Sequence, residues 1–99
     1  MTCPAVLVHF DWDPAKARSN LLKHCVSFDE AAEVFEDPLS VTVFDGWHSE
    51  GEVRWASVGA SRRHRLLVVF HTHRGGRIRL ISARLPTANE RLQYEEERP

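Results

Sequence analysis

Cysteine is scarce in this chain, and long apolar runs are missing from it. The two cysteines among 99 residues, Cys3 and Cys25, do not make the disulfide framework of a small secreted protein. The sequence also shows no charged-then-apolar secretory signal and no stretch of about 20 apolar residues that would suit a membrane span. We therefore expect a protein of the reducing cytoplasm.

The sequence also lacks a convincing metal motif. Among six histidines, His71 and His73 are the closest pair, and alternate residues of a strand share a face. No third ligand stands at a characteristic spacing from them. We interpret both as polar residues near a turn and expect no metal or other cofactor.

Acidic residues are nearly absent from one long segment. Residues 53–91 hold nine arginines and a single acid, Glu90, whereas residues 1–52 hold ten acids and three basic residues. Arginine forms bidentate contacts with phosphate and stacks on bases, so this arginine block predicts an anion or nucleic-acid surface. A solvated strand face is the alternative, since charge runs are usually solvated.

Composition and pattern predict a single α+β domain over residues 1–99. With 42% hydrophobic and 27% charged residues, the chain is typical of globular proteins. Residues 5–10 suit a first strand. Asp13 is a good helix N-cap before Pro14, with Ala17, Leu21, Leu22 and Cys25 as the apolar stripe, and Lys16, Asn20, Lys23 and His24 on the other face.

A second helix and a run of strands follow. Ser27 to Glu30 is a capping box, and Asp37-Pro38 ends that helix. Short strands are then expected at residues 41–45, 54–61, 66–72 and 77–84, as an antiparallel meander. Thr87 to Glu90 is another capping box and predicts a final helix. The expected order is β-α-α-β-β-β-β-α, with one sheet face packed on helices and the other open.

The last strand and the segment before residue 55 carry candidate chemistry. Strict alternation would place Ile78, Leu80, Ser82 and Arg84 on one face, and Arg77, Arg79, Ile81 and Ala83 on the other. Arg84 suits either a phosphate clamp or an ion pair to a helix end. Glu50, Glu52 and Arg54 alternate too, so a carboxylate and a guanidinium could converge on one phosphate, with a local ion pair as the alternative.

Metal-free RNA cleavage needs a base, a cation for the developing phosphorane charge, and an acid for the leaving oxygen. Glu50 or Glu52, Arg54 or Arg84, and His48 or Tyr94 could fill these roles respectively, and their assignment stays open. Trp47 is the best candidate for stacking on a base. We expect Trp12 and Trp55 in the core.

Ordered motifs between residues 10 and 96 resemble the BrnT family of bacterial toxins. They are Trp12-Asp13-Pro14 with Lys16, Asn20 and Lys23-His24, then Val26 to Ala31, Asp37-Pro38, Asp45 with His48-Ser49-Glu50, Glu52 and Arg54, Gly59, Leu67 to Phe70, Ile78-Arg79, Ile81 to Arg84, and Glu90-Arg91 with Tyr94-Glu95-Glu96.

The resemblance implies a RelE-like fold and the ribonuclease toxin of a type II toxin-antitoxin pair. The implied partner is an antitoxin, usually of the ribbon-helix-helix type, which neutralises the toxin and binds operator DNA. Carried over by position, the catalytic candidates are Glu50, Arg54, Arg79 and Arg84, followed by Lys23, His48 and Tyr94. The RNA-binding candidates are Arg62, Arg63, Arg65, Arg77 and Trp47.

Two positions depart from the family. Cys25 stands where glycine is usual after Lys-His, at a helix C-cap that favours a left-handed residue. The segment Leu85 to Asn89 is often basic in the family and is uncharged here. A catalytically weak module that mainly holds the antitoxin is therefore the alternative function. An RNA-binding domain without catalysis ranks last, because it gives Glu50 and Glu52 no role.

Overall fold

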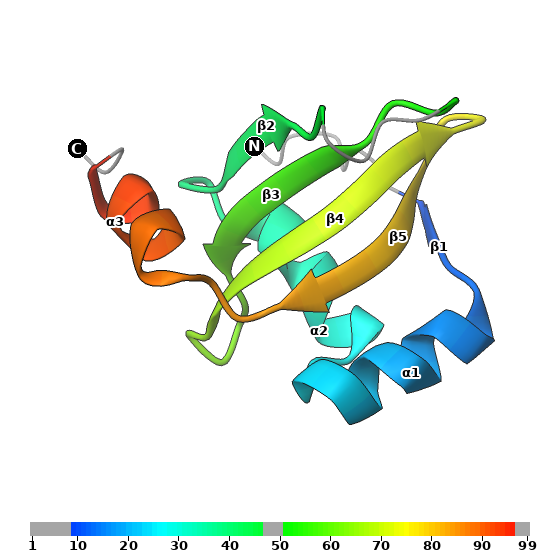
Figure 1. Cartoon of the computed structure of the whole chain (residues 1–99), viewed down its shortest axis with the longest axis horizontal. Helices are drawn as coiled ribbons and strands as arrows, with labels where there is room; N and C mark the ends of the chain where they lie inside the picture. Colours follow the sequence, from blue (N-terminus) through cyan, green and yellow to red (C-terminus); the bar gives the residue numbers. More distant parts are fainter. Residues whose placement is uncertain (1–8, 47–50, 97–99) are drawn as a thin grey trace, which may run out of the picture.

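One mixed sheet organises the part of the chain that the computed structural model describes, residues 9–46 and 51–96. Its strands are β1 (Phe10–Asp11), β2 (Val41–Phe44), β3 (Trp55–Ala60), β4 (Leu66–Arg74) and β5 (Arg77–Arg84). The spatial order is β1-β5-β4-β3-β2 (Figure 1). Strands β2 to β5 form the predicted antiparallel meander, and β1 pairs in parallel with β5. The predicted α+β class and element order are confirmed.

The helices begin and end at the predicted signals. They are α1 (Pro14–His24), α2 (Phe28–Ala32), the 3-10 helix η1 (Glu33–Glu36) and α3 (Ala88–Glu96). Asp13 caps α1 by accepting from the Ala15 N–H, and Ser27 caps α2 by accepting from the Glu30 N–H. At α3 the capping box is complete, because Thr87 and Glu90 each bond the other's N–H.

The core lies between one sheet face and the segment from the end of α1 to η1. Its fully buried side chains are Val26, Phe28, Ala31, Val34, Leu67, Val69, Leu80 and Ala83. Figure 1 shows α1 and α2 together on this side, with α3 standing apart from them near the start of β4. On the opposite face Leu66 and Val68 are buried too, so the second face, predicted to be open, is covered in part.

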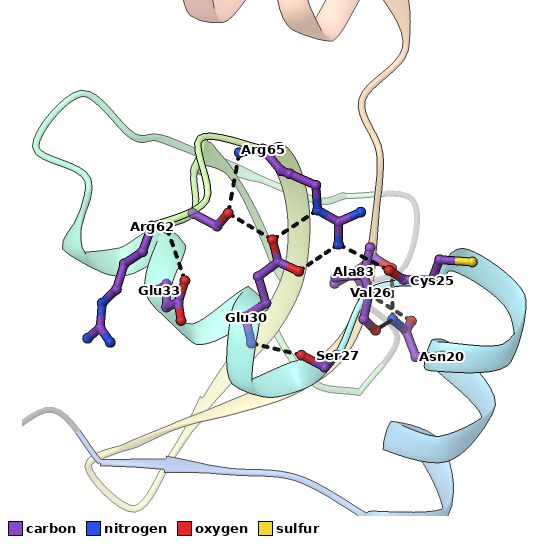
Figure 2. Close-up of polar contacts among 10 residues, drawn as sticks. Asn20, Cys25, Val26, Ser27, Glu30, Glu33, Arg62, Arg65 and Ala83 are labelled. Atoms are coloured by element: carbon purple, nitrogen blue, oxygen red, sulfur yellow. Dashed lines mark hydrogen bonds and ion pairs between the residues drawn. The ribbon is translucent and has the colours of Figure 1, made fainter.

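The predicted faces of α1 are wrong for Asn20, Leu21 and Leu22, although Ala17 packs against the core as expected. Asn20 is buried, whereas Leu21 and Leu22 are 50% and 85% exposed. The Asn20 amide donates to the carbonyls of Val26 and Ala83, and its oxygen accepts from the Ala83 N–H (Figure 2). Because β1 pairs only the start of β5, the rest of that strand edge needs other partners, and one primary amide supplies them.

A β-bulge in β5 overturns the strict alternation expected there. Phe70 pairs with Ser82 but His71 pairs with Leu80, so Ile81 is an extra residue. As a result, Leu80 and Ala83 both face the core, and Ser82 and Arg84 lie on the open face. The bulge thus turns the end of β5 toward the candidate site.

His71 is a core residue, which corrects its interpretation as a turn-proximal polar group. Its side chain is 1% exposed, its Nε2 lies 2.8 Å from Ser57 Oγ, and its ring meets Phe35 edge-on. Burial, aided by His73, lowers the pKa of His71 to about 4. Within residues 9–46 and 51–96, no three His, Cys, Asp or Glu side chains are grouped to hold a metal ion. None of the described helices is long and apolar enough to cross a membrane.

Candidate functional site

A hollow of about 330 Å³ lies on the open face of the sheet. The residues that line it come from the end of α1, the β2–β3 connection, β4 and β5, and they are His24, Asp45, Arg54, Phe70, Ile81, Ser82 and Arg84. The bulge places Ser82 opposite Phe70, and both lie on the side away from the core. Two arginines that are 30 positions apart in the sequence thus meet at one concave surface.

Arg54 reaches the hollow because the β2–β3 ladder continues past the strands. The Asp45 N–H donates to the Arg54 carbonyl over 2.9 Å, which sets Asp45 beside Arg54 just beyond the ends of β2 and β3. A carboxylate and a guanidinium therefore stand together on this side of the hollow. Both side chains are half-buried.

Arg84 is held in place by α3. Its Nη1 and Nη2 donate to the two carboxylate oxygens of Glu90 over 2.7 and 2.9 Å, and Nη1 also donates to the Leu85 carbonyl. The guanidinium carbon lies 5.2 Å from the centre of the Phe70 ring. The hydrogen bonds between Arg84 and Glu90 lower the pKa of Glu90 to about 2. The ion pair to a helix end, expected as an alternative, is therefore present.

The Glu90 contact still leaves Arg84 able to bind an anion. A guanidinium has five N–H groups, and three of those of Arg84 are used in these bonds. The Nε–H and one Nη2 hydrogen make no hydrogen bond to any residue that the structure describes. These two donors form a fork of the kind that fits two phosphate oxygens.

Further charged groups continue the open face beyond Arg54. Arg74 donates to Glu52 over 2.6 Å, and this bond, with the charges of Arg54 and Arg79, holds the pKa of Glu52 below its usual range. Arg79 donates to Asp11 over 3.1 Å. The charges of Arg54 and Arg79 thus both act on Glu52. Neither Glu52 nor Arg79 lines the hollow.

The remaining catalytic candidates lie elsewhere. Lys23 lines a neighbouring hollow beside α1. Tyr94 lines a separate hollow with His64 and Arg91, and its hydroxyl donates to Asp37 over 2.6 Å. Trp47, His48 and Glu50 fall outside the described residues.

Several arginines of the arginine block, residues 53–91, form ion pairs within the fold. Arg65 donates to both carboxylate oxygens of Glu30 and to the Cys25 carbonyl (Figure 2). Arg62 bonds Glu33 through its main chain and Glu36 through its side chain. These contacts tie the β3–β4 turn, residues 61–65, to α2 and η1. Arg63 on the same turn and Arg77 at the β4–β5 turn are exposed, and an RNA-binding role for these residues stays a prediction.

Sequence reasoning did not name the other two ionisable residues of the hollow, His24 and Asp45, as site candidates. Both were part of the ordered motifs, His24 in Lys23-His24 and Asp45 ahead of His48-Ser49-Glu50. Their position in those motifs was the available signal. The motifs do not contain the register of β2 against β3 or the path of α1. These two features bring Asp45 and His24 to Arg54 and Arg84.

Comparison with known proteins gives a family for the chain. The family model for the ribonuclease toxin BrnT of type II toxin-antitoxin systems matches residues 12–90. The crystal structure of the Brucella abortus ribonuclease toxin BrnT superposes with a TM-score of 0.60 at 17% identity, over 82% of this chain and 99% of that chain. No curated protein sequence matches. The chain therefore belongs to the BrnT family of ribonuclease toxins of type II toxin-antitoxin systems.

Proposed function

We propose that this chain is a metal-independent endoribonuclease that cleaves RNA in the hollow on the open sheet face and thereby inhibits translation. The observation that carries the proposal is the meeting of Arg54 and Arg84 at one concave surface, next to His24 and Asp45. Two guanidinium groups there can hold one phosphodiester between them. The cytoplasm, where RNA is translated, is the proposed place of action.

The proposed reaction is transfer of the phosphodiester to the neighbouring 2'-oxygen. A base removes the 2'-hydroxyl proton, the 2'-oxygen bonds to phosphorus, and the bond from phosphorus to the 5'-oxygen breaks as an acid protonates that oxygen. The products are a 2',3'-cyclic phosphate and a 5'-hydroxyl. Arg54 and the two remaining donors of Arg84 stabilise the extra negative charge of the phosphorane.

Base and acid are proposed among groups at or near the hollow. His24 lines it, and an imidazole can both accept and donate a proton, so His24 joins Glu50 and His48 as a candidate. Glu52 is a weaker base, since its bond to Arg74 lowers its pKa. Tyr94 ranks behind these groups because its hydroxyl is bonded to Asp37 in another hollow.

The proposed partner is a cognate antitoxin of the ribbon-helix-helix type, which neutralises the toxin and contacts operator DNA itself. Type II toxin-antitoxin membership supports a protein antitoxin. Exposed apolar side chains on the edge strand β2, Val43 and Phe44, offer a surface where another chain could bury area. Toxin and antitoxin would then form a hetero-oligomer.

Cleavage of a defined RNA in EDTA by the purified, antitoxin-free protein tests the enzyme. Wild type should leave 2',3'-cyclic phosphate ends, and Arg54→Ala should lower the rate at least about a hundredfold. Arg84→Lys is preferred to alanine because it keeps a cation near Glu90 while losing the fork. Arg18→Ala, an exposed arginine of α1 outside the hollow, is the control. Unchanged cleavage by a folded Arg54→Ala protein would exclude the site.

The second candidate function is an antitoxin-holding module with weak activity. Glu90 favours it, because its carboxylate occupies one edge of Arg84 and repels phosphate, while Leu85 to Asn89 supplies no positive charge. Growth arrest on expression without the antitoxin distinguishes the endoribonuclease from the antitoxin-holding module. If wild type, Glu50→Ala and Arg84→Ala all arrest growth equally, the toxic activity lies outside the proposed site.

A further inference from the structure

A second hollow, of about 230 Å³, lies between α1 and β5. The residues that line it are Lys16, Ser19, Asn20, Lys23, His24, Ile81 and Ser82. Three of them, His24, Ile81 and Ser82, also line the first hollow. The two hollows therefore adjoin at the β5 bulge, and these three residues lie between the first hollow and the one beside α1.

Two ammonium groups, those of Lys16 and Lys23, line the second hollow. Among the described residues that line it there is no carboxylate. Lys16 and Lys23 lie two turns apart on the same side of α1, about 10 Å along the helix axis. Asn20, between them, is anchored to β5 and holds this side of the helix against the strand.

This arrangement suits phosphate groups that lie apart from the one that reacts. A lysine ammonium is a mobile point charge that binds phosphate without fixed geometry. Arg84 instead presents a fixed fork, because Glu90 holds it. The first hollow thus contains the fixed guanidinium of Arg84, and the second contains the mobile ammonium groups of Lys16 and Lys23.

We propose that the second hollow is a subsite for single-stranded RNA, in which Lys16 and Lys23 bind phosphates of nucleotides flanking the scissile one. The inference rests on the proposed function, since it assumes that RNA occupies the first hollow. An RNA strand that leaves the first hollow over Ile81 and Ser82 meets the two ammonium groups along α1. Lys23 is then a positioning residue, which revises its place among the catalytic candidates.

The subsite predicts that the lysines matter only for RNA long enough to reach α1. Binding of fluorescent 2'-O-methyl oligonucleotides, which cannot be cleaved because the 2'-oxygen is blocked, is measured by anisotropy. The short probe is a dinucleotide, whose single phosphate would occupy the first hollow, and the long probe has about ten nucleotides. For the Lys16→Ala/Lys23→Ala double variant we expect about tenfold weaker binding of the long oligonucleotide at low salt. Binding of the short one should stay within about twofold of wild type.

Salt dependence gives a second readout of the same contacts. For single strands each phosphate contact contributes about 0.7 to the slope of log affinity against log salt, so loss of both lysines should flatten the slope by about 1.4. Arg18→Ala removes a positive charge from the same helix outside both hollows and should leave the length effect intact.

Two results would overturn the subsite: unchanged long-oligonucleotide binding by the double variant, or an equal loss for both lengths. Because the probe cannot react, the outcome does not depend on catalysis. If wild type cleaves no RNA yet shows the lysine-dependent length effect, the proposed nuclease function fails and the subsite stands. If cleavage occurs and the length effect is absent, only the subsite fails.

Discussion

Cys25 adopts a backbone conformation that suits glycine. Its φ of 57° and ψ of 32° are left-handed, and its N–H bonds the Leu21 carbonyl to close α1. A side chain in this region costs about 1 to 2 kcal/mol, part of which glycine loses again through its flexible unfolded state. We predict that Cys25→Gly raises the free energy of unfolding by about 0.5 to 1 kcal/mol in urea titrations.

The matched control for this substitution is Cys25→Ala, which removes the thiol but keeps Cβ. It should leave stability nearly unchanged. An equal gain from both substitutions would mean that the thiol, and not the backbone conformation, limits stability at this position.

His71 should make the protein sensitive to mild acid. Its folded pKa of about 4 lies below the ordinary value of 6.5, so the unfolded chain binds a proton more readily between these limits. Stability is therefore full above about pH 6.5 and falls as the pH drops toward 4. We predict a loss of about 2 kcal/mol between pH 7 and pH 5, measured by urea unfolding.

His73 is the control for that dependence, since it is exposed on the same strand. His73→Gln should keep most of the loss between pH 7 and pH 5. Equal stability of the wild-type protein at the two pH values would contradict a buried, neutral His71.

Single residues show why sequence reasoning succeeded at Cys25 and failed at Asn20. The family resemblance, in which glycine usually follows Lys-His, indicated a left-handed residue at this C-cap, and Cys25 adopts that conformation. Asn20 is buried because the edge of β5 lacks strand partners beyond β1, which no local pattern around residue 20 contains. Hydrophobic periodicity does not identify a polar residue that is buried because it bonds main-chain groups distant in the sequence.

At the scale of elements, α3 is fastened to the sheet by the Arg84–Glu90 pair. The folded pKa of Glu90 is about 2, below the ordinary 4.5, so its carboxylate form is favoured in the folded state. The stabilisation is complete above about pH 4.5 and disappears as the pH falls through 2. We predict a loss of about 1 to 2 kcal/mol between pH 5 and pH 3 from this pair.

Glu90→Gln tests this attachment, because glutamine keeps the shape of the side chain and removes its charge. The variant should be less stable than wild type at pH 7, and its loss between pH 5 and pH 3 should be smaller. If the acid dependence below pH 5 is the same in both proteins, His71 or a carboxylate other than Glu90 is responsible for it.

The elements themselves were largely predictable, because their signals are local. The caps at Asp13, Ser27 and Thr87 mark the observed helix starts, and the strands expected at residues 66–72 and 77–84 are within two residues of those observed. The bulge at Ile81 was not predictable from alternation, since an inserted residue looks the same in the sequence as a regular one. It mattered for the site, because it places Ser82 and Arg84 on the open face.

At the scale of the whole molecule, much of the charge division is neutralised within the fold. Ion pairs join the acidic first half to the arginine block at Glu30–Arg65, Glu36–Arg62, Glu52–Arg74 and Asp11–Arg79. A count of charges in the sequence does not say which of them pair with each other, and nucleic-acid binding by the arginine block stays a prediction. Exposed pairs of this sort add little stability.

The residues of the candidate site were only partly predictable from the sequence. Arg54 and Arg84 were named from their strand positions, and the meander brings them to one hollow. Lys23 lines the adjoining hollow, whereas Tyr94 belongs to another one. Convergence across strands depends on register and on the bulge, so sequence alone could propose the residues but not their grouping.

The proposed reaction requires that an RNA phosphate binds in the hollow between Arg54 and Arg84. The most direct measurement is an NMR titration of the antitoxin-free protein with an uncleavable 2'-O-methyl oligonucleotide. We predict that the Arg84 Nε–H and the amides of Phe70 and Ser82 shift first, with little change at His64 and Arg91 in the separate hollow beside α3. Shifts confined to His64, Arg91 and the β3–β4 turn, with Arg84 unaffected, would contradict the account.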